Sequence, residues 1–164
     1  MRDAWLAIRS VTWALAFPGV IAGYVPWRYF GLSRITVDPL RPAHAAGLLS
    51  IGVGAALLAA CILEFARRGR GTLSPLDPPR TLVVRGLYRY VRNPMYVAVT
   101  AILLGEALLL QSRALVVYWA VFFACVNLFV IGYEEPALRA RFGESYDEYR
   151  RHVRRWIPRV PLRS

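Results

Sequence analysis

Residues 94–133 read PMYVAVTAILLGEALLLQSRALVVYWAVFFACVNLFVIGY. This stretch contains two apolar segments, at about 94–112 and 114–133, separated by the short polar sequence Gln111-Ser112-Arg113. A transmembrane helix needs about 20 mostly apolar residues, so each segment is long enough to cross a bilayer. Because the connection is so short, we expect a tight antiparallel hairpin whose far ends meet at one membrane face.

Two more apolar segments precede this hairpin, at about 10–28 and 42–64. The chain has 164 residues, 57% of them hydrophobic, which is enough for one small domain. The sequence therefore predicts an all-α, polytopic membrane protein. We expect one domain over residues 1–164, with four transmembrane helices and a cytoplasmic helical tail.

The charge distribution predicts an orientation. The chain has 21 basic and 10 acidic residues, and the arginines lie mostly between the apolar segments rather than along water-facing helices. This pattern argues against nucleic-acid binding. If the N-terminus is inside, all basic residues except Arg28, Arg34, Arg41 and Arg113 lie on the cytoplasmic side. The positive-inside rule then places both termini in the cytoplasm.

Small residues and cysteines inside the apolar segments suggest packing rather than chemistry. Gly19 with Gly23, and Ser50 with Gly54, are spaced for close helix approach. Cys61 and Cys125 each lie within an apolar segment without a nearby set of metal ligands. We therefore expect neither a metal site nor a disulfide.

Residues 86–96 read GLYRYVRNPMY and precede the third apolar segment. Asn93 suits an N-cap and Pro94 suits the first helical turn, so a helix is expected to begin here. Its free N–H groups and the positive end of its dipole would then face the cytoplasmic interface, where an anionic group can bind. The alternative is a plain N-cap on a membrane helix.

The fourth segment ends in Tyr133-Glu134-Glu135-Pro136, which puts two carboxylates where the hairpin returns to the interface. Two alternatives to a functional role are an interaction with the following helix N-terminus and ion pairing with nearby arginines. Away from the ends of the spans the acidic residue is Glu106, for which we expect an ion pair with Arg113 near the outer face or else a functional role.

After Pro136, apolar residues recur at steps of three and four, which predicts amphipathic helices on the membrane surface or over the helix ends. Gly143, followed by Ser145 and Glu148 as a capping box, predicts a break into two short helices. Such a segment can cover a cytoplasmic pocket.

From about Arg80 to Pro158 the chain resembles the integral-membrane methyltransferases related to isoprenylcysteine carboxyl methyltransferase and phospholipid methyltransferase. The isoprenylcysteine enzymes carry G-x-Y-x-x-x-R-H-P-x-Y, then E-E, F-G-x-x-Y-x-x-Y and a terminal I/L-P. The matching residues follow in the same order: Gly86, Tyr88, Arg92, Asn93, Pro94, Tyr96, Glu134, Glu135, Phe142, Gly143, Tyr146, Tyr149, Ile157 and Pro158.

This resemblance implies S-adenosylmethionine-dependent methyl transfer, with cofactor segments at about 80–96 and 134–158. Glu134 is then the nearest candidate base for an amine acceptor. The cofactor-binding residues implied by the resemblance are Arg80, Thr81, Leu82, Val83, Tyr88, Arg92, Asn93, Pro94, Met95, Tyr96 and Glu135.

Two departures bear on the acceptor. Asn93 stands where the isoprenylcysteine enzymes have His, and Ile131 stands where they have an Arg associated with the substrate carboxylate. The patterns N-P-M-Y and Y-E-E-P are closer to the phospholipid enzymes, which favours a phospholipid-amine acceptor. The alternatives are isoprenylcysteine-type carboxyl methylation, and a non-catalytic four-helix membrane protein or transporter.

The expected partners are the lipid bilayer and a lipid-like or small hydrophobic acceptor, without nucleic acid. We expect a multi-pass protein of the bacterial inner membrane. The sequence does not determine the oligomeric state.

Overall fold

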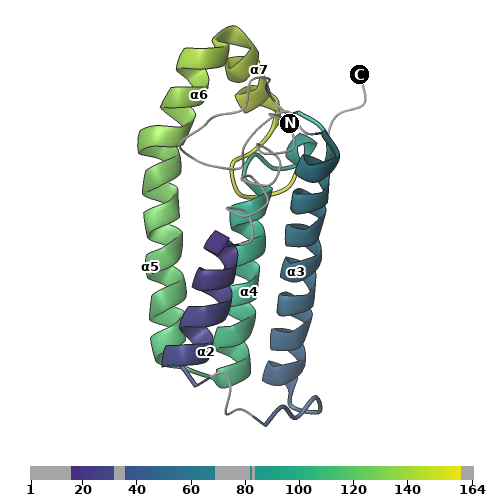
Figure 1. The fold of residues 1–164 in the computed structure, drawn as a ribbon, viewed down its shortest axis with the longest axis vertical. Coiled ribbons are helices and arrows are strands. Elements are labelled where there is room, and N and C mark those ends of the chain that lie inside the picture. The colour runs from purple at the N-terminus through teal and green to yellow at the C-terminus, as the bar shows by residue number, and fades with distance from the viewer. Residues whose placement is uncertain (1–15, 32–35, 69–81, 83, 160–164) are drawn as a thin grey trace, which may run out of the picture. The chain divides into compact units, whose positions relative to one another are not determined.

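The computed structural model describes residues 16–31, 36–68, 82 and 84–159, and these residues form an all-α structure, as predicted (Figure 1). Among them β-structure is limited to an isolated bridge between Val91 and Arg154. Two of the elements, η1 and η4, are π-helical, and η3 is a 3₁₀ helix. In chain order the elements are η1 (Val20–Tyr24), α2 (Val25–Tyr29), α3 (Pro42–Arg68), η3 (Gly86–Arg89), α4 (Pro94–Leu110), α5 (Arg113–Phe129), η4 (Val130–Glu134), α6 (Glu135–Phe142) and α7 (Glu144–His152).

Contacts divide the chain into two compact units. The bundle unit comprises Leu15–Ala59 and Met95–Val126, and so holds η1, α2 and most of α3, α4 and α5. The tail unit includes Ala60–Pro94 and Asn127–Ser164, and it holds η3, η4, α6 and α7.

In the bundle unit, α3 and α4 approach each other at glycines. A Cβ atom added to Gly105 would lie 2.6 Å from the Gly47 carbonyl oxygen, and one added to Gly54 would lie 2.7 Å from the Ala98 carbonyl oxygen. The Ser50 hydroxyl donates a hydrogen bond to the Ala101 carbonyl at 2.8 Å. The predicted packing role of Ser50 and Gly54 is therefore confirmed.

The other predicted pair behaves differently. A Cβ atom added to Gly19 or Gly23 would meet no atom within 4 Å outside its own helical turn among the described residues. This pair therefore makes no close helix contact in the described part of the chain.

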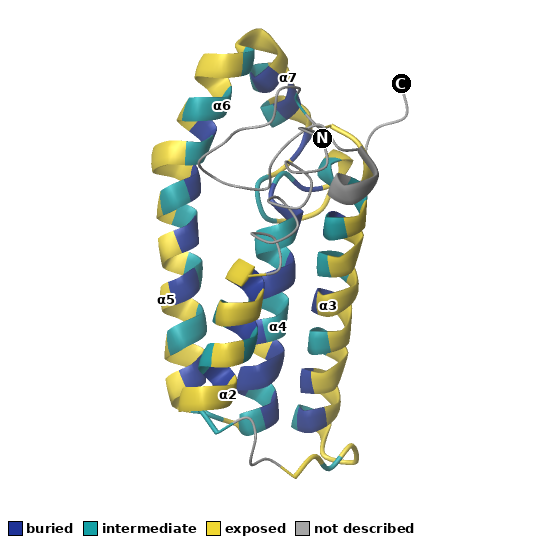
Figure 2. Ribbon diagram, in the orientation of Figure 1, coloured by how far each residue is buried: buried dark blue, intermediate teal, exposed yellow. Residues whose placement is uncertain are grey.

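The helices of the bundle unit expose much of their apolar surface (Figure 2). Two helices are long and apolar enough to cross a membrane, at Pro42–Glu64 and Arg113–Phe142, yet only 17% and 22% of their most apolar windows are buried. The core helix of a soluble protein would be mostly covered. A shorter apolar helix, Pro94–Leu110, ends slightly before the predicted boundary.

Two π-turns occur at the same distance before a proline. The Val25 N–H donates to the Val20 carbonyl before Pro26, and the Glu135 N–H donates to the Val130 carbonyl before Pro136. Proline has no N–H, and its ring crowds the carbonyl four residues earlier. The wider π-turn accommodates both restrictions, so α5 continues through η4 into α6 without ending.

The tail breaks at Gly143 between α6 and α7, as predicted. Gly143 has φ 53° and ψ −129°, a conformation that side chains other than hydrogen disfavour. The predicted capping box is wrong, because α7 already begins at Glu144 and its N-cap, Gly143, has no side chain to accept a hydrogen bond. Here the glycine conformation, rather than a serine hydroxyl, sets the helix boundary.

Glu106 lies on α4 and is 3% exposed. It makes no ion pair with the exposed Arg113 within the described ranges, and its Oε2 atom is buried without a hydrogen-bond partner there. The expected ion pair is therefore wrong.

The close approach of α3 and α4 predicts that Gly105→Ala lowers the free energy of unfolding by about 1–3 kcal/mol, because the added methyl group overlaps the Gly47 backbone. Thermal unfolding in detergent measures the change. Gly52→Ala is the matched control, since Gly52 lies on α3 where an added Cβ meets no atom within 4 Å. Because alanine has a higher helix propensity than glycine, Gly52→Ala should leave the free energy of unfolding unchanged or slightly higher. Equal effects of both substitutions would contradict the packing account.

Candidate functional site

The segment that precedes α4 is held against the C-terminal segment of the tail unit. The Arg92 N–H donates to the Arg154 carbonyl, and the Arg159 N–H donates to the Tyr90 carbonyl, both at 2.9 Å. The Asn93 amide Nδ2 donates to the Arg155 carbonyl at 3.2 Å. These bonds align residues 90–93 with residues 154–159, although more than 60 residues of chain lie between some of the partners.

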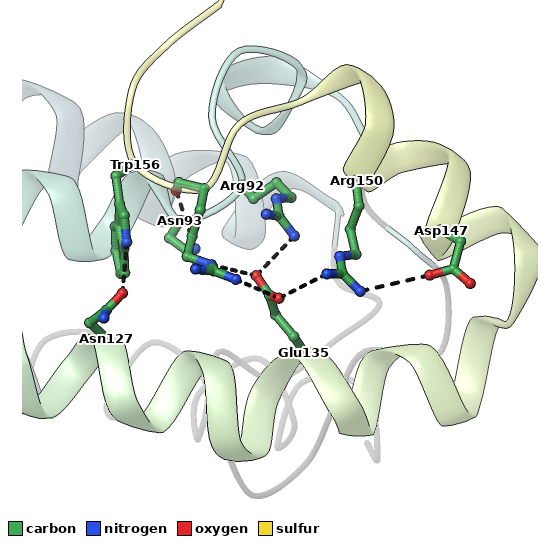
Figure 3. Close-up of polar contacts among 8 residues, drawn as sticks. Arg92, Asn93, Asn127, Glu135, Asp147, Arg150 and Trp156 are labelled. Carbon is green, nitrogen blue, oxygen red and sulfur yellow. Dashed lines mark hydrogen bonds and ion pairs between the residues drawn. The ribbon is translucent and has the colours of Figure 1, made fainter.

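Glu135, the first residue of α6, is 6% exposed and is the centre of a cluster of arginines (Figure 3). Its Oε1 atom lies 2.9 Å from Arg92 Nη1 and accepts a hydrogen bond from Arg155 Nε at 2.7 Å. Its Oε2 atom accepts a hydrogen bond from Arg155 Nη2 at 2.9 Å and lies 3.7 Å from Arg150 Nη2. Residues from the loop before α4, from α7 and from the C-terminal segment therefore converge on one carboxylate.

The cluster, which we call the Glu135 cluster and define as Glu135, Arg92, Arg150 and Arg155, has an excess of positive charge. Asp147 partly compensates Arg150 at 3.8 Å, but Asp147 also pairs with Arg139 at 3.1 Å. The side chains of Arg92 and Glu135 are 10% and 8% exposed. An excess of charge at this burial favours binding of an anionic group.

Two tyrosines belong to the hydrophobic core cluster of the tail unit. Tyr146 and Tyr149 are buried with Val153, and partly buried side chains pack against them from Leu82, Leu138 and Phe142. The Tyr149 hydroxyl donates to the Tyr88 carbonyl at 2.6 Å. Burial raises the pKa of Tyr149, so the phenol keeps its proton for this bond. Burial, and then the nearby Glu135 charge, also raise the pKa of Tyr146.

A further contact ties the C-terminal segment to the end of α5. The Trp156 indole Nε1 donates to the Asn127 amide oxygen at 3.0 Å (Figure 3). This bond holds the residue after Arg155 independently of the arginine side chains.

The tail unit holds most of the predicted site residues. Arg92, Asn93 and Glu135 are joined through the contacts above, and Tyr88 is joined to α7. Leu82 packs against the hydrophobic core cluster of Tyr146 and Tyr149. Glu134 is half-buried at the end of η4. Helix α4 begins at Pro94, as predicted.

Met95 and Tyr96 lie in the first turn of α4 and belong to the bundle unit. Arg80, Thr81 and Val83 lie outside the described residues.

Arg150 and Arg155 were not predicted as site residues. Both lie in the arginine-rich tail, where the sequence predicts an orientation and possible ion-pair partners for Glu134 and Glu135, without singling out any arginine. The sequence places Glu135 in an arginine-rich context, but it shows neither that this acid is buried nor which arginines pair with it.

The phospholipid methyltransferase family profile matches residues 42–145, so the chain belongs to this family. Protein-S-isoprenylcysteine O-methyltransferase from Schizosaccharomyces pombe is 35% identical over 85 residues, which cover 49% of this chain and 34% of the yeast protein. The match therefore spans about a third of that relative's length.

An uncharacterized protein from Haemophilus influenzae is 35% identical over 63 residues, which cover 38% of this chain and 100% of that protein. No solved structure matches the chain significantly. The family match contains Arg92, Asn93 and Glu135 and ends before Arg150 and Arg155. Together, the family and the exposed apolar helices identify a membrane protein of a methyltransferase family.

Tyr149→Phe should lower the free energy of unfolding by about 1 kcal/mol or somewhat more, because the substitution leaves the Tyr88 carbonyl without its phenol donor. Chemical unfolding in detergent, followed by circular dichroism, measures the change. Tyr90→Phe is the control, since Tyr90 is 38% exposed. A wild-type stability for Tyr149→Phe would show that the 2.6 Å contact contributes nothing.

Proposed function

We propose that this protein is a membrane-embedded methyltransferase that uses S-adenosylmethionine and binds it at the Glu135 cluster. The membership in the phospholipid methyltransferase family supports the reaction class. The observation that carries the location is the convergence of three arginines on one buried carboxylate, at residues that include the motif residues Arg92 and Glu135.

The residues of the cluster fit the anionic end of this cofactor. The Arg92 Nε atom is buried without a hydrogen-bond acceptor among the described residues, and guanidinium groups bind carboxylates well. Both oxygens of Glu135 already contact arginines. We therefore assign the cofactor carboxylate to Arg92, and we assign to Glu135 the orientation of the arginines.

The bound cofactor supplies an electrophilic methyl group on a sulfonium, which a nucleophile takes by in-line displacement. The protein then needs to align the acceptor and exclude water rather than form a covalent intermediate. Within the tail unit, Tyr88 is the aromatic residue that we propose to face the sulfonium. For an amine acceptor, we assign to the Glu134 carboxylate the removal of the amine proton.

We further propose four transmembrane helices, with α4 and α5 as a tight hairpin and both termini in the cytoplasm of a bacterial cell. The two-residue connection, Gln111 and Ser112, supports the hairpin. Gln111 has φ 48°, and the Ser112 hydroxyl accepts a hydrogen bond from the Leu115 N–H at the start of α5. The Glu135 cluster then lies at the cytoplasmic membrane surface, within reach of a soluble cofactor and a lipid acceptor.

The acceptor we favour is the primary amine of a phospholipid headgroup. Asn93 and Ile131 support this choice, because both depart from the isoprenylcysteine pattern. The yeast relative's name supports a prenylated cysteine carboxylate as the second candidate.

Arg92→Gln should weaken S-adenosylmethionine binding by roughly 10- to 100-fold, the effect of losing a hydrogen bond from a charged donor. Isothermal titration calorimetry on detergent-purified protein measures the affinity. Arg89→Gln is the matched control, because Arg89 is exposed and contacts only the Tyr90 ring in the structure described, at 5.6 Å. Absence of binding to folded wild-type protein would contradict the proposed function.

In vesicles of phosphatidylethanolamine, radiolabelled S-adenosylmethionine should label the lipid, and Glu134→Gln should lower the rate by about 100-fold or more without changing cofactor affinity. A parallel assay with a prenylated cysteine tests the second candidate. Label in the prenylated cysteine alone would reject the phospholipid amine, and full activity of Glu134→Gln would reject its role as the base.

A further inference from the structure

Arg155 makes more of the contacts within the Glu135 cluster than the other two arginines. Its Nε and Nη2 atoms donate to the two oxygens of Glu135 at 2.7 and 2.9 Å, which is a bidentate pair. Arg92 and Arg150 each approach one oxygen, at 2.9 and 3.7 Å. The bidentate pair fixes the plane of the carboxylate, whereas a single contact does not.

The main chain of Arg155 reaches the other half of the site. Its carbonyl accepts the hydrogen bond from Asn93 Nδ2 at 3.2 Å. Arg155 thus contacts both sequence motifs, the one before α4 and the one at the start of α6, through different groups.

The position of Arg155 does not depend on its own ion pair. The Arg154 carbonyl accepts a hydrogen bond from the Arg92 N–H, and the Trp156 indole is bonded to Asn127. The Arg159 N–H is bonded to the Tyr90 carbonyl. Replacing the Arg155 side chain therefore leaves the surrounding segment anchored on both sides.

We propose that Arg155 is a positioning residue for the cofactor site, which holds the Glu135 carboxylate so that Arg92 presents its guanidinium to the anionic end of the cofactor. This inference rests on the proposed function. The Arg92 guanidinium now forms an ion pair with Glu135 but no hydrogen bond to it, and without the bidentate pair the carboxylate is free to turn and accept hydrogen bonds from Arg92. Arg92 is then engaged by Glu135 and lost to the ligand.

Because Glu135 and the ligand carboxylate then compete for Arg92, we expect a loss of binding affinity that is selective for ligands with a carboxylate. S-adenosylhomocysteine carries the amino-acid carboxylate, and 5′-methylthioadenosine lacks the amino-acid part. Arg155→Gln should weaken S-adenosylhomocysteine binding by roughly tenfold and leave 5′-methylthioadenosine binding unchanged. Arg155→Lys restores the charge with a single point contact, so its affinity for S-adenosylhomocysteine should be intermediate.

Calorimetry with both ligands tests the proposal, and thermal unfolding verifies that each variant is folded. Arg154→Gln is the matched control, because it removes the same charge from an exposed neighbour, and it should bind both ligands as the wild type does. If Arg155→Gln does not fold, Arg155→Lys carries the same comparison.

Wild-type affinity of the Arg155 variants for both ligands would overturn the proposal. An equal fold-loss of affinity for both ligands would overturn it as well, because it would indicate a general structural role. Failure of the wild type to bind S-adenosylhomocysteine would instead reject the proposed function itself.

Discussion

The tail unit depends on one electrostatic constraint, which is the burial of the Glu135 carboxylate. A carboxylate that is 6% exposed must be paired, because an isolated charge at this depth is very unfavourable. Its partners, Arg92, Arg150 and Arg155, come from three segments, so pairing the charge also assembles the unit. Removing Glu135 would leave three guanidinium groups facing one another, whereas removing one arginine would leave two.

The helix geometry that places Glu135 follows from Pro136. Because the proline cannot continue an α-helical hydrogen-bond pattern, the chain widens into η4 and the Glu135 N–H bonds to the Val130 carbonyl. The same spacing, with Val20 and Pro26, produces η1 in the bundle unit. Both units therefore contain the same short pattern, Val-Ile with a proline six residues after the valine, and both form a π-turn there. The two sites differ in the residue before the proline, which is a carboxylate only at Pro136.

The sequence predicted local features well. The helix start at Pro94, the break at Gly143 and the packing of Ser50 and Gly54 each depend on neighbouring residues or on backbone conformation. Ion pairing was not predictable in the same way. The arginines of the tail are alike in sequence, and what selects Arg150 and Arg155 is tertiary structure: α7 and the C-terminal segment carry them to Glu135. The wrong ion pair at Glu106 has the same origin, since helical spacing alone says nothing about burial.

The most direct measurement is an experimental structure of the protein with S-adenosylhomocysteine bound. The account predicts the ligand carboxylate within hydrogen-bond distance of Arg92, about 2.7–3.2 Å, with the bidentate pair between Arg155 and Glu135 intact. A ligand bound away from the Glu135 cluster would contradict it, as would a ligand ammonium that displaces Arg155 from Glu135.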